Sequence, residues 1–273
     1  MGIIKNQKSK IRNYLVLIAV ALLTVSLCIL YNVLNFSNSF PEAANIEPDT
    51  VCLQTEASLT VQEMSMPEPE PKPGKINPQL SNLTNILDLD NTFLVDMKYA
   101  TTDNFTGMAL YEDIDGAYLQ PDVALMLVKA HQYMKELRPD AGLRLLVYDA
   151  ARPLSVQRIM YERVQNTPYH RYVAHPDRHS LHNYGAAVDV TIADSLGQPL
   201  DMGTPFDHFG RAAGIGNEEQ LIQQGLLTRQ HVQNRQFLRQ VMRHAGFIPI
   251  SGEWWHFNAC SLQEARRRYS IIE

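Results

Sequence analysis

The sequence has few cysteines and no excess of basic residues, and each shortage excludes a class of protein. Its 273 residues include only Cys28, Cys52 and Cys260, too few and too irregularly spaced for a disulfide scaffold or a cysteine-built zinc site. Lysine and arginine (24) are outnumbered by aspartate and glutamate (29), which gives a net charge of −5. Because phosphate binding needs a basic surface, nucleic acid is not expected as a main partner. The sequence also lacks internal repeats and a Gly-rich phosphate loop.

The first 34 residues combine a basic segment with a long apolar run. Residues 1–13 contain no acidic side chain, and residues 14–34 contain no charged one. A helix of about 20 apolar residues crosses a bilayer. The next basic residue is Lys72, so the positive-inside rule places residues 1–13 in the cytoplasm. We therefore expect an uncleaved transmembrane anchor in the inner or cytoplasmic membrane, with the rest of the chain in the periplasm or outside the cell. Secretion after signal cleavage is the alternative.

The remainder divides into a polar segment and a folded domain. Residues 35–75 are acidic and rich in proline, ending in MPEPEPKPGK, and are expected to form an extended tether. Residues 76–273 are long enough to bury a substantial core. In an oxidising compartment Cys52 and Cys260 could pair, although their spacing does not decide it.

Within the domain, strands and helices interleave without a βαβ rhythm, which favours an α+β fold. Apolar periodicity and capping residues predict helices at 121–137, 154–164 and 229–245, the last capped by Thr228. Ser261 followed by Glu264 predicts a final helix. Strands are expected at 92–100, 143–148 and 186–192, and segments 247–250 and 254–257 are expected to pair.

Two stretches supply residues suited to a catalytic metal site. HSLHNYGAAVD contains His182 and Asp189, and GEWWHF contains Glu253 and His256. Catalytic zinc takes three protein ligands from His, Asp or Glu and leaves one position for water, while a separate carboxylate serves as general base. These four residues meet that requirement. From spacing alone, an ordinary hydrogen-bond network between two strands is the alternative.

Small and charged residues accompany these stretches. Gly185 and Ala187 lie between the proposed ligands, where they could leave room for the metal loop or could serve turn and core packing. Asp149 and Arg152, in YDAARP, follow an apolar strand. An arginine held by a carboxylate suits stabilisation of an oxyanion. A structural salt bridge is the alternative.

Together these motifs resemble a known family. SLHNYGAAVD fits the S-x-H-x-x-G-x-A-x-D pattern of the M15-type zinc D,D-peptidases, and GEWWHF fits their E-x-x-H element. With DMKYATTDNFTG, DAARP and MGTPFD, the chain resembles the D-alanyl-D-alanine dipeptidase (VanX-type) branch over residues 93–257. The resemblance implies one hedgehog/DD-peptidase-like α+β domain, with a central antiparallel sheet flanked by helices. It also implies one zinc ion per chain, bound by His182, Asp189 and His256, although other divalent ions could bind such a set.

The resemblance further implies a role for each remaining motif residue in hydrolysing D-Ala-D-Ala to two D-alanines. Glu253 would be the general base on the zinc-bound water and would pass its proton to the leaving amine. Arg152 would stabilise the oxyanion, with Asp149 orienting it. Ser180 and Asp207 match positions near the substrate's free ammonium group.

Two other functions remain open at this point. Peptidoglycan D,D-carboxypeptidases, which trim stem peptides, commonly carry E-P-W-H, whereas Trp254 replaces that proline here and favours the dipeptidase. A zinc-binding module without catalysis often lacks the base, whereas Glu253 is present. VanX-type enzymes are cytoplasmic, so the expected anchor implies a dipeptidase that salvages D-Ala-D-Ala outside the inner membrane rather than one that confers glycopeptide resistance.

Overall fold

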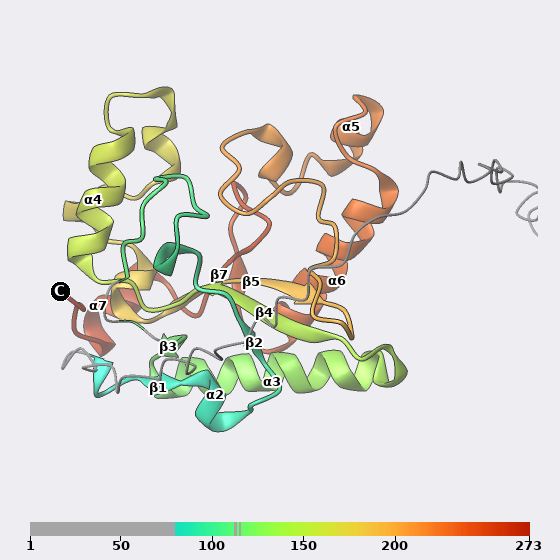
Figure 1. The fold of residues 1–273 in the computed structure, drawn as a ribbon, viewed down its shortest axis with the longest axis horizontal. Helices are drawn as coiled ribbons and strands as arrows, with labels where there is room; N and C mark the ends of the chain where they lie inside the picture. Colours follow the sequence, from blue (N-terminus) through green and yellow to red (C-terminus); the bar gives the residue numbers. More distant parts are fainter. Residues whose placement is uncertain (1–79, 112–113, 115) are drawn as a thin grey trace, which may run out of the picture. The chain divides into compact units, whose positions relative to one another are not determined.

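The central feature of the fold is a five-stranded sheet. A computed structural model describes residues 80–273 except 112, 113 and 115. The sheet has the order β2-β4-β5-β7-β6 (Figure 1). Its strands are β2 (Leu94–Val95), β4 (Arg144–Asp149), β5 (Ala187–Ala193), β7 (His256–Asn258) and β6 (Ile248–Pro249). A separate antiparallel pair consists of β1 (Thr84–Asn85) and β3 (Tyr118–Leu119).

The middle strand, β5, fixes the register of the candidate site. Every residue of β5 is buried, and β5 pairs antiparallel with both β4 and β7. Across these pairs, Asp189 lies opposite Asp149 on one side and opposite His256 on the other. The sheet therefore aligns three candidate residues from distant parts of the sequence in one row.

The sheet is predicted to be antiparallel, but the structure has one parallel pair of strands at an edge. β2 pairs parallel with β4, while the other pairings in the sheet are antiparallel. A parallel pair requires a long crossover, and here α3 (Pro121–Leu137) lies between the two strands in the chain. The strand expected at 92–100 is also shorter than predicted, because the 3₁₀ turn η2 (Lys98–Ala100) ends it.

Helices flank the sheet, as the sequence predicts (Figure 1). The helices are α2 (Ile86–Leu89), α3, α4 (Leu154–Val164), α5 (Glu218–Gln223), α6 (Arg229–His244) and α7 (Leu262–Arg268). Thr228 caps α6 by accepting a hydrogen bond from the backbone N–H of His231, and Ser261 caps α7 in the same way through Glu264. The mixed α+β fold is thus confirmed.

The membrane prediction needs correction. Within residues 80–273 as described, no helix has the length and apolar character needed to cross a bilayer. The longest, α3, has 17 residues and an amphipathic pattern, whereas a bilayer requires about 20 apolar residues. The expected anchor at 14–34, the tether at 35–75 and Cys52 lie outside the described residues. The prediction of a single-pass membrane protein with an external catalytic domain is therefore corrected to this extent: the described residues do not support it.

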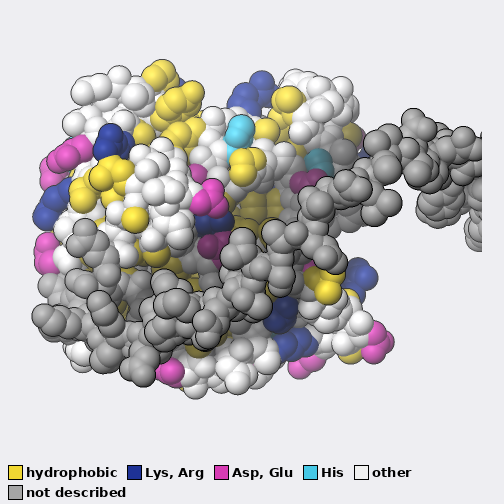
Figure 2. Space-filling view, in the orientation of Figure 1, with side chains coloured by type: hydrophobic (Ala, Val, Ile, Leu, Met, Phe, Trp, Pro, Cys, Tyr) yellow, Lys and Arg dark blue, Asp and Glu magenta, His cyan; other side chains and the backbone are white. Residues whose placement is uncertain are grey.

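Figure 2 shows the charge distribution on one face of the described domain. Basic and acidic side chains are interspersed over this face rather than gathered by sign. Cys260 is buried, and its thiol is free of disulfides among the described residues.

Candidate active site

A cavity of about 520 Å³ gathers seven of the eight residues selected from the sequence. They are Arg152, Ser180, His182, Asp189, Asp207, Glu253 and His256. The eighth, Asp149, is fully buried and supports Arg152 from behind the cavity wall. Sequence motifs separated by about 100 residues therefore meet at a single hollow.

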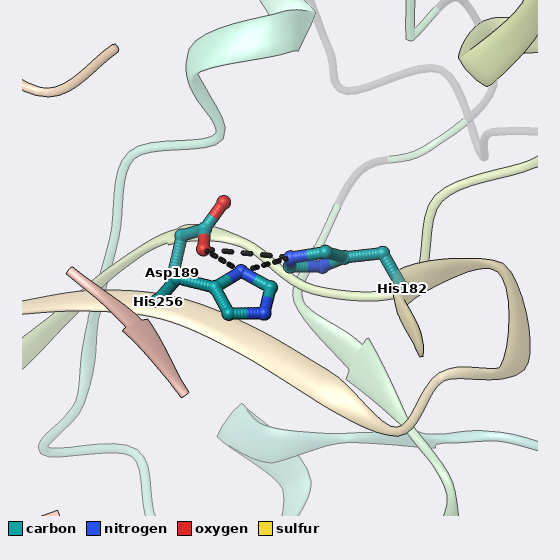
Figure 3. A group of neighbouring side chains, drawn as sticks. All are labelled: His182, Asp189 and His256. Carbon is teal, nitrogen blue, oxygen red and sulfur yellow. Dashed lines mark hydrogen bonds and ion pairs between the residues drawn. The ribbon is translucent and has the colours of Figure 1, made fainter. Parts of the chain in front are cut away.

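Three potential metal ligands converge in the cavity (Figure 3). His182 comes from the 3₁₀ turn η6 (Leu181–Tyr184), Asp189 from β5 and His256 from β7. The His256 Nδ1 atom lies 3.0 Å from Asp189 Oδ1 and 3.1 Å from His182 Nε2. The distance from His182 Nε2 to Asp189 Oδ1 is 3.4 Å. In the part of the chain that the structure describes, these three side chains form the group that could hold a metal ion. We call them the triad.

The outer hydrogen bonds of the two imidazoles show why a cation fits the triad. His182 donates from Nδ1 to the Ala150 carbonyl at 2.7 Å, and His256 donates from Nε2 to Asn258 Oδ1 at 2.7 Å. Each neutral ring therefore turns a lone pair toward Asp189. Three acceptors 3.0–3.4 Å apart match the edge of about 3.3 Å in a tetrahedron with metal–ligand distances of ~2.0–2.1 Å.

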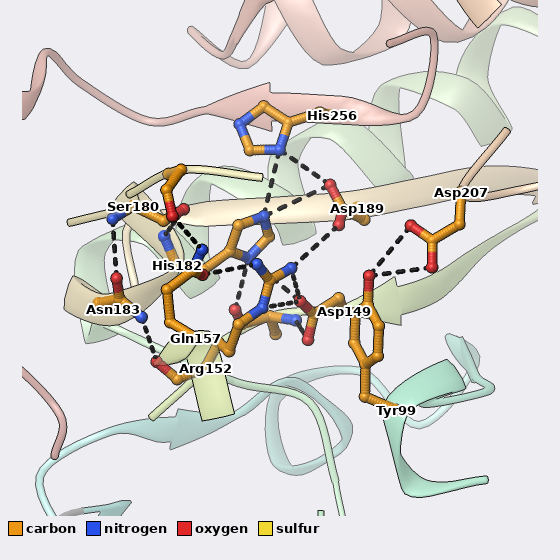
Figure 4. Close-up of polar contacts among 12 residues, drawn as sticks. Tyr99, Asp149, Arg152, Gln157, Ser180, His182, Asn183, Asp189, Asp207 and His256 are labelled. Atoms are coloured by element: carbon orange, nitrogen blue, oxygen red, sulfur yellow. Dashed lines mark hydrogen bonds and ion pairs between the residues drawn. The ribbon is translucent and has the colours of Figure 1, made fainter. Parts of the chain in front are cut away.

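Asp149 and Arg152 form a buried ion pair beneath the cavity (Figure 4). Arg152 donates from Nε to Asp149 Oδ2 at 2.9 Å, from Nη2 to the same oxygen, and from Nη1 to Gln157 at 2.9 Å. Asp149 also accepts from the Tyr111 hydroxyl at 2.6 Å. Burial opposes the charge of Arg152, but Asp149 together with Tyr99, Tyr111 and Asp189 outweighs it, which holds the pKa of the guanidinium above its ordinary value. Three of five N–H groups are engaged, which leaves two for a substrate oxygen.

Glu253 lies beside the triad without belonging to it. Its Oε2 atom is 4.0 Å from His256 Nδ1. Burial raises the pKa of Glu253 to about 7, with a further contribution from the negative charges of Asp189 and Asp207. A carboxylate with a pKa near neutrality can both accept and return a proton.

Asp207 has a partner that the sequence reasoning missed. The Tyr99 hydroxyl lies 3.0 Å from each carboxylate oxygen of Asp207. Burial raises the pKa of Asp207 to about 7, and the charge of Asp189 adds to this. Tyr99 lies within the DMKYATTDNFTG stretch, but nothing in that stretch indicates a contact with a residue 108 positions away.

The loop that carries Asp207 is held by α6. Arg235 is fully buried and donates from Nε to the Met202 carbonyl at 2.6 Å and from Nη2 to the Ala212 carbonyl at 2.9 Å. Trp254 holds the same loop by donating to the Thr204 hydroxyl at 2.9 Å. These bonds place the Asp207 carboxylate in the cavity wall.

Ser180 caps the turn that presents His182. Its hydroxyl accepts a hydrogen bond from the His182 backbone N–H at 3.3 Å, while its own N–H donates to Asn183 at 2.7 Å. Figure 4 shows Ser180 and Asp207 on opposite sides of the triad. The structure thus places both residues at the cavity but does not bring them together.

Sequence comparison assigns the domain that contains this cavity to a family. The model of the Peptidase M15 family, described as D-ala-D-ala dipeptidase, matches residues 81–271. The chain belongs to the Peptidase M15 family. It is a peptidase, and the family match extends over all eight residues selected from the sequence.

Curated relatives of this M15 peptidase carry one name. The D-alanyl-D-alanine dipeptidase of Escherichia coli K12 is 33% identical over 181 residues, covering 65% of this chain and 86% of the relative. The D-alanyl-D-alanine dipeptidase of Enterococcus faecium is 34% identical over 187 residues, covering 59% and 83%. That of Synechocystis is 30% identical over 171 residues, covering 51% and 68%.

Proposed function

We propose that this M15 peptidase hydrolyses D-alanyl-D-alanine to two D-alanines with a zinc ion held by His182, Asp189 and His256. The convergence of three lone pairs beside an uncoordinated carboxylate is the observation that carries the proposal. Two imidazoles and one carboxylate suit zinc better than magnesium or calcium, which prefer oxygen ligands. When bound, zinc supplies Lewis-acid chemistry, polarising the substrate carbonyl and lowering the pKa of water toward ~7.

Glu253 moves the proton in this proposal. Its carboxylate accepts a proton from the attacking water as the new C–O bond forms at the scissile carbonyl carbon. The same carboxyl then donates that proton to the amide nitrogen as the C–N bond breaks, so two free amino acids leave. The pKa of about 7 allows both steps near neutral pH.

Arg152 stabilises the negative charge that develops on the carbonyl oxygen. Asp149 and Gln157 occupy three of its N–H groups and fix the guanidinium plane, and the remaining two are available to the oxyanion. Because the group is already oriented, little reorganisation is needed in the transition state.

Asp207 holds the free ammonium group of the dipeptide. Three carboxylates of the described residues line the cavity, and Asp207 is the one left once Asp189 joins the triad and Glu253 moves the proton. The Tyr99 hydroxyl lies 3.0 Å from each of its oxygens. An anion at this place favours a substrate in which the residue that supplies the scissile carbonyl also carries the free amino terminus. Longer peptides would place a neutral amide against it, at a cost in affinity.

The proposal is tested by comparing substrates and one variant. We expect faster hydrolysis of D-Ala-D-Ala than of a pentapeptide stem, and a loss of about 10²–10⁴-fold in kcat for Glu253→Gln. Glu219→Gln, at an exposed glutamate of α5, is the matched control and should retain full activity. Preference for the stem peptide would indicate a D,D-carboxypeptidase. Equal turnover by Glu253→Gln and the wild type would refute the role of the base.

A further inference from the structure

Two non-glycine residues of the described chain have left-handed backbone angles, and both line the cavity. They are Asp207, with φ of 59°, and His179, with φ of 63° and ψ of 155°. Side chains strongly disfavour such angles, so residues held there concentrate at functional sites. The proposed mechanism uses Asp207 but gives His179 no task.

The His179 ring is oriented by a buried tyrosine. Its Nδ1 lies 2.9 Å from the hydroxyl of Tyr184, a residue only 3% exposed. When that hydroxyl donates to Nδ1, the neutral ring carries its proton on Nε2. Among the described residues Nε2 has no hydrogen-bond partner, so the ring offers an N–H donor to the cavity that it lines.

The position of His179 complements that of Asp207. His179 is adjacent to Ser180, which Figure 4 shows across the triad from Asp207. A dipeptide with its ammonium at Asp207 and its scissile carbonyl at the triad directs its carboxylate to the Ser180 side. His179 is therefore placed to meet the carboxylate.

The two arginines of the cavity are less suited to this carboxylate. Asp149 and Gln157 hold Arg152, and the proposed mechanism assigns its two remaining N–H groups to the oxyanion. Arg171 is exposed, and the adjacent Tyr172 stacks on Phe209 with 5.1 Å between ring centroids. This stacking places the segment that carries Arg171 beside the loop that carries Asp207, and Arg171 itself donates from Nε to the Pro168 carbonyl at 3.2 Å.

We infer that His179 binds the free carboxylate of the C-terminal D-alanine by donating a hydrogen bond from Nε2. His179 and Asp207 then bind the two charged ends of a zwitterionic dipeptide, one on each side of the triad. The inference rests on the proposed function for the orientation of the substrate. It adds a requirement for a free carboxylate one residue after the scissile bond.

The test is calorimetric binding of D-Ala-D-Ala and of its C-terminal amide to the Glu253→Gln protein, with and without His179→Gly. Glycine accepts the backbone angles of position 179, so folding should be preserved, as thermal unfolding would show. We expect His179→Gly to weaken binding of the acid about tenfold and to leave binding of the amide unchanged. His179→Gln, which restores an amide donor of similar reach, should recover part of the loss.

Three results would overturn the assignment. Equal weakening for acid and amide would show that His179 only supports the cavity wall. If Arg171→Ala lost the discrimination between acid and amide while His179→Gly kept it, Arg171 rather than His179 would bind the carboxylate. Failure of the Glu253→Gln protein to bind either ligand would refute the proposed function as well, which distinguishes that case from the first two.

Discussion

His182 Nε2 and His256 Nδ1 face each other at 3.1 Å, although 74 residues separate the two histidines in the chain. Both rings donate from their other nitrogen, to the Ala150 carbonyl and to Asn258 respectively. Neither facing nitrogen then has a proton to share, so the pair repels unless a cation lies between. This relationship makes the outer hydrogen bonds as important to the site as the ligands.

Removing one outer bond should weaken metal binding without removing a ligand. Asn258→Ala leaves the Nε2–H of His256 without its acceptor, so the ring is free to turn its lone pair away from the triad. We expect the affinity for zinc to fall about 10–100-fold, measured by competition with a chromophoric chelator. Gln230→Ala, at an exposed site on α6, is the control. Unchanged affinity in Asn258→Ala would show that the sheet alone orients His256.

Arg152 should matter for the transition state more than for substrate binding. We expect Arg152→Ala to lower kcat ~10²–10³-fold, with a smaller change in KM. Because Asp149 would then be buried without its partner, unfolding should also become easier by about 3 kcal/mol. Arg152→Lys should recover little activity, since an ammonium cannot hold Asp149 and Gln157 together. A kcat within tenfold of wild type for Arg152→Ala would exclude the proposed role.

The metal-free protein should become less stable as pH rises through neutrality, in part because of Asp207. Its pKa in the folded state is about 7, above the ordinary value of 3.8. The folded state therefore binds a proton that the unfolded state has lost, and this stabilisation disappears between pH ~4 and ~7. Asp207→Asn should reduce the difference in unfolding free energy between pH 5 and pH 8 by an amount on the order of 2 kcal/mol. Identical pH profiles in urea unfolding would contradict the raised pKa.

His131 should produce the opposite pH dependence. Its ring is fully buried, both ring nitrogens lack a hydrogen-bond partner among the described residues, and Asp90 Oδ2 is 3.5 Å away. Burial, followed by the charge of Lys135, lowers the pKa of His131 to about 4, so its stabilisation is complete above pH 6.5 and is lost as pH falls toward 4. Between pH 7 and pH 4.5, the free energy of unfolding of His131→Leu should fall by about 2 kcal/mol less than that of the wild type. If His131→Leu and the wild type lost the same unfolding free energy over this pH range, the burial of a neutral ring would be contradicted.

Helices α3, α4, α6 and α7 were predictable because their causes are local, whereas α2 and α5 were not predicted. Apolar periodicity sets α3, and the side chains of Thr228 and Ser261 identify the starts of α6 and α7. The ligand motifs are equally local: SLHNYGAAVD covers the turn η6 and the start of β5, which follows it directly, and GEWWHF runs into the start of β7.

Contacts between distant segments could not be read from the sequence. Tyr99 and Tyr111 become important only through Asp207 and Asp149, which the fold brings to them from 108 and 38 positions away. The parallel pairing of β2 likewise depends on the path of the crossover.

Gly185 illustrates an ambiguity that the structure resolves in favour of packing. Its φ is 63°, and a Cβ there would lie 3.3 Å from the Gln120 backbone nitrogen and 3.4 Å from Leu83. The glycine therefore permits a turn and a close approach to neighbouring segments. Its contacts do not point toward the triad.

The most direct test of the central claim is the zinc content of purified protein, measured together with D-alanine release from D-Ala-D-Ala. We predict about one zinc per chain in the wild type and in Glu253→Gln, with activity lost in the latter, whereas His256→Ala should lose both zinc and activity. Chelation should abolish wild-type activity, and added zinc should restore it. Full activity in the chelated wild type, or zinc retained at wild-type affinity by His256→Ala, would contradict a zinc site built from His182, Asp189 and His256.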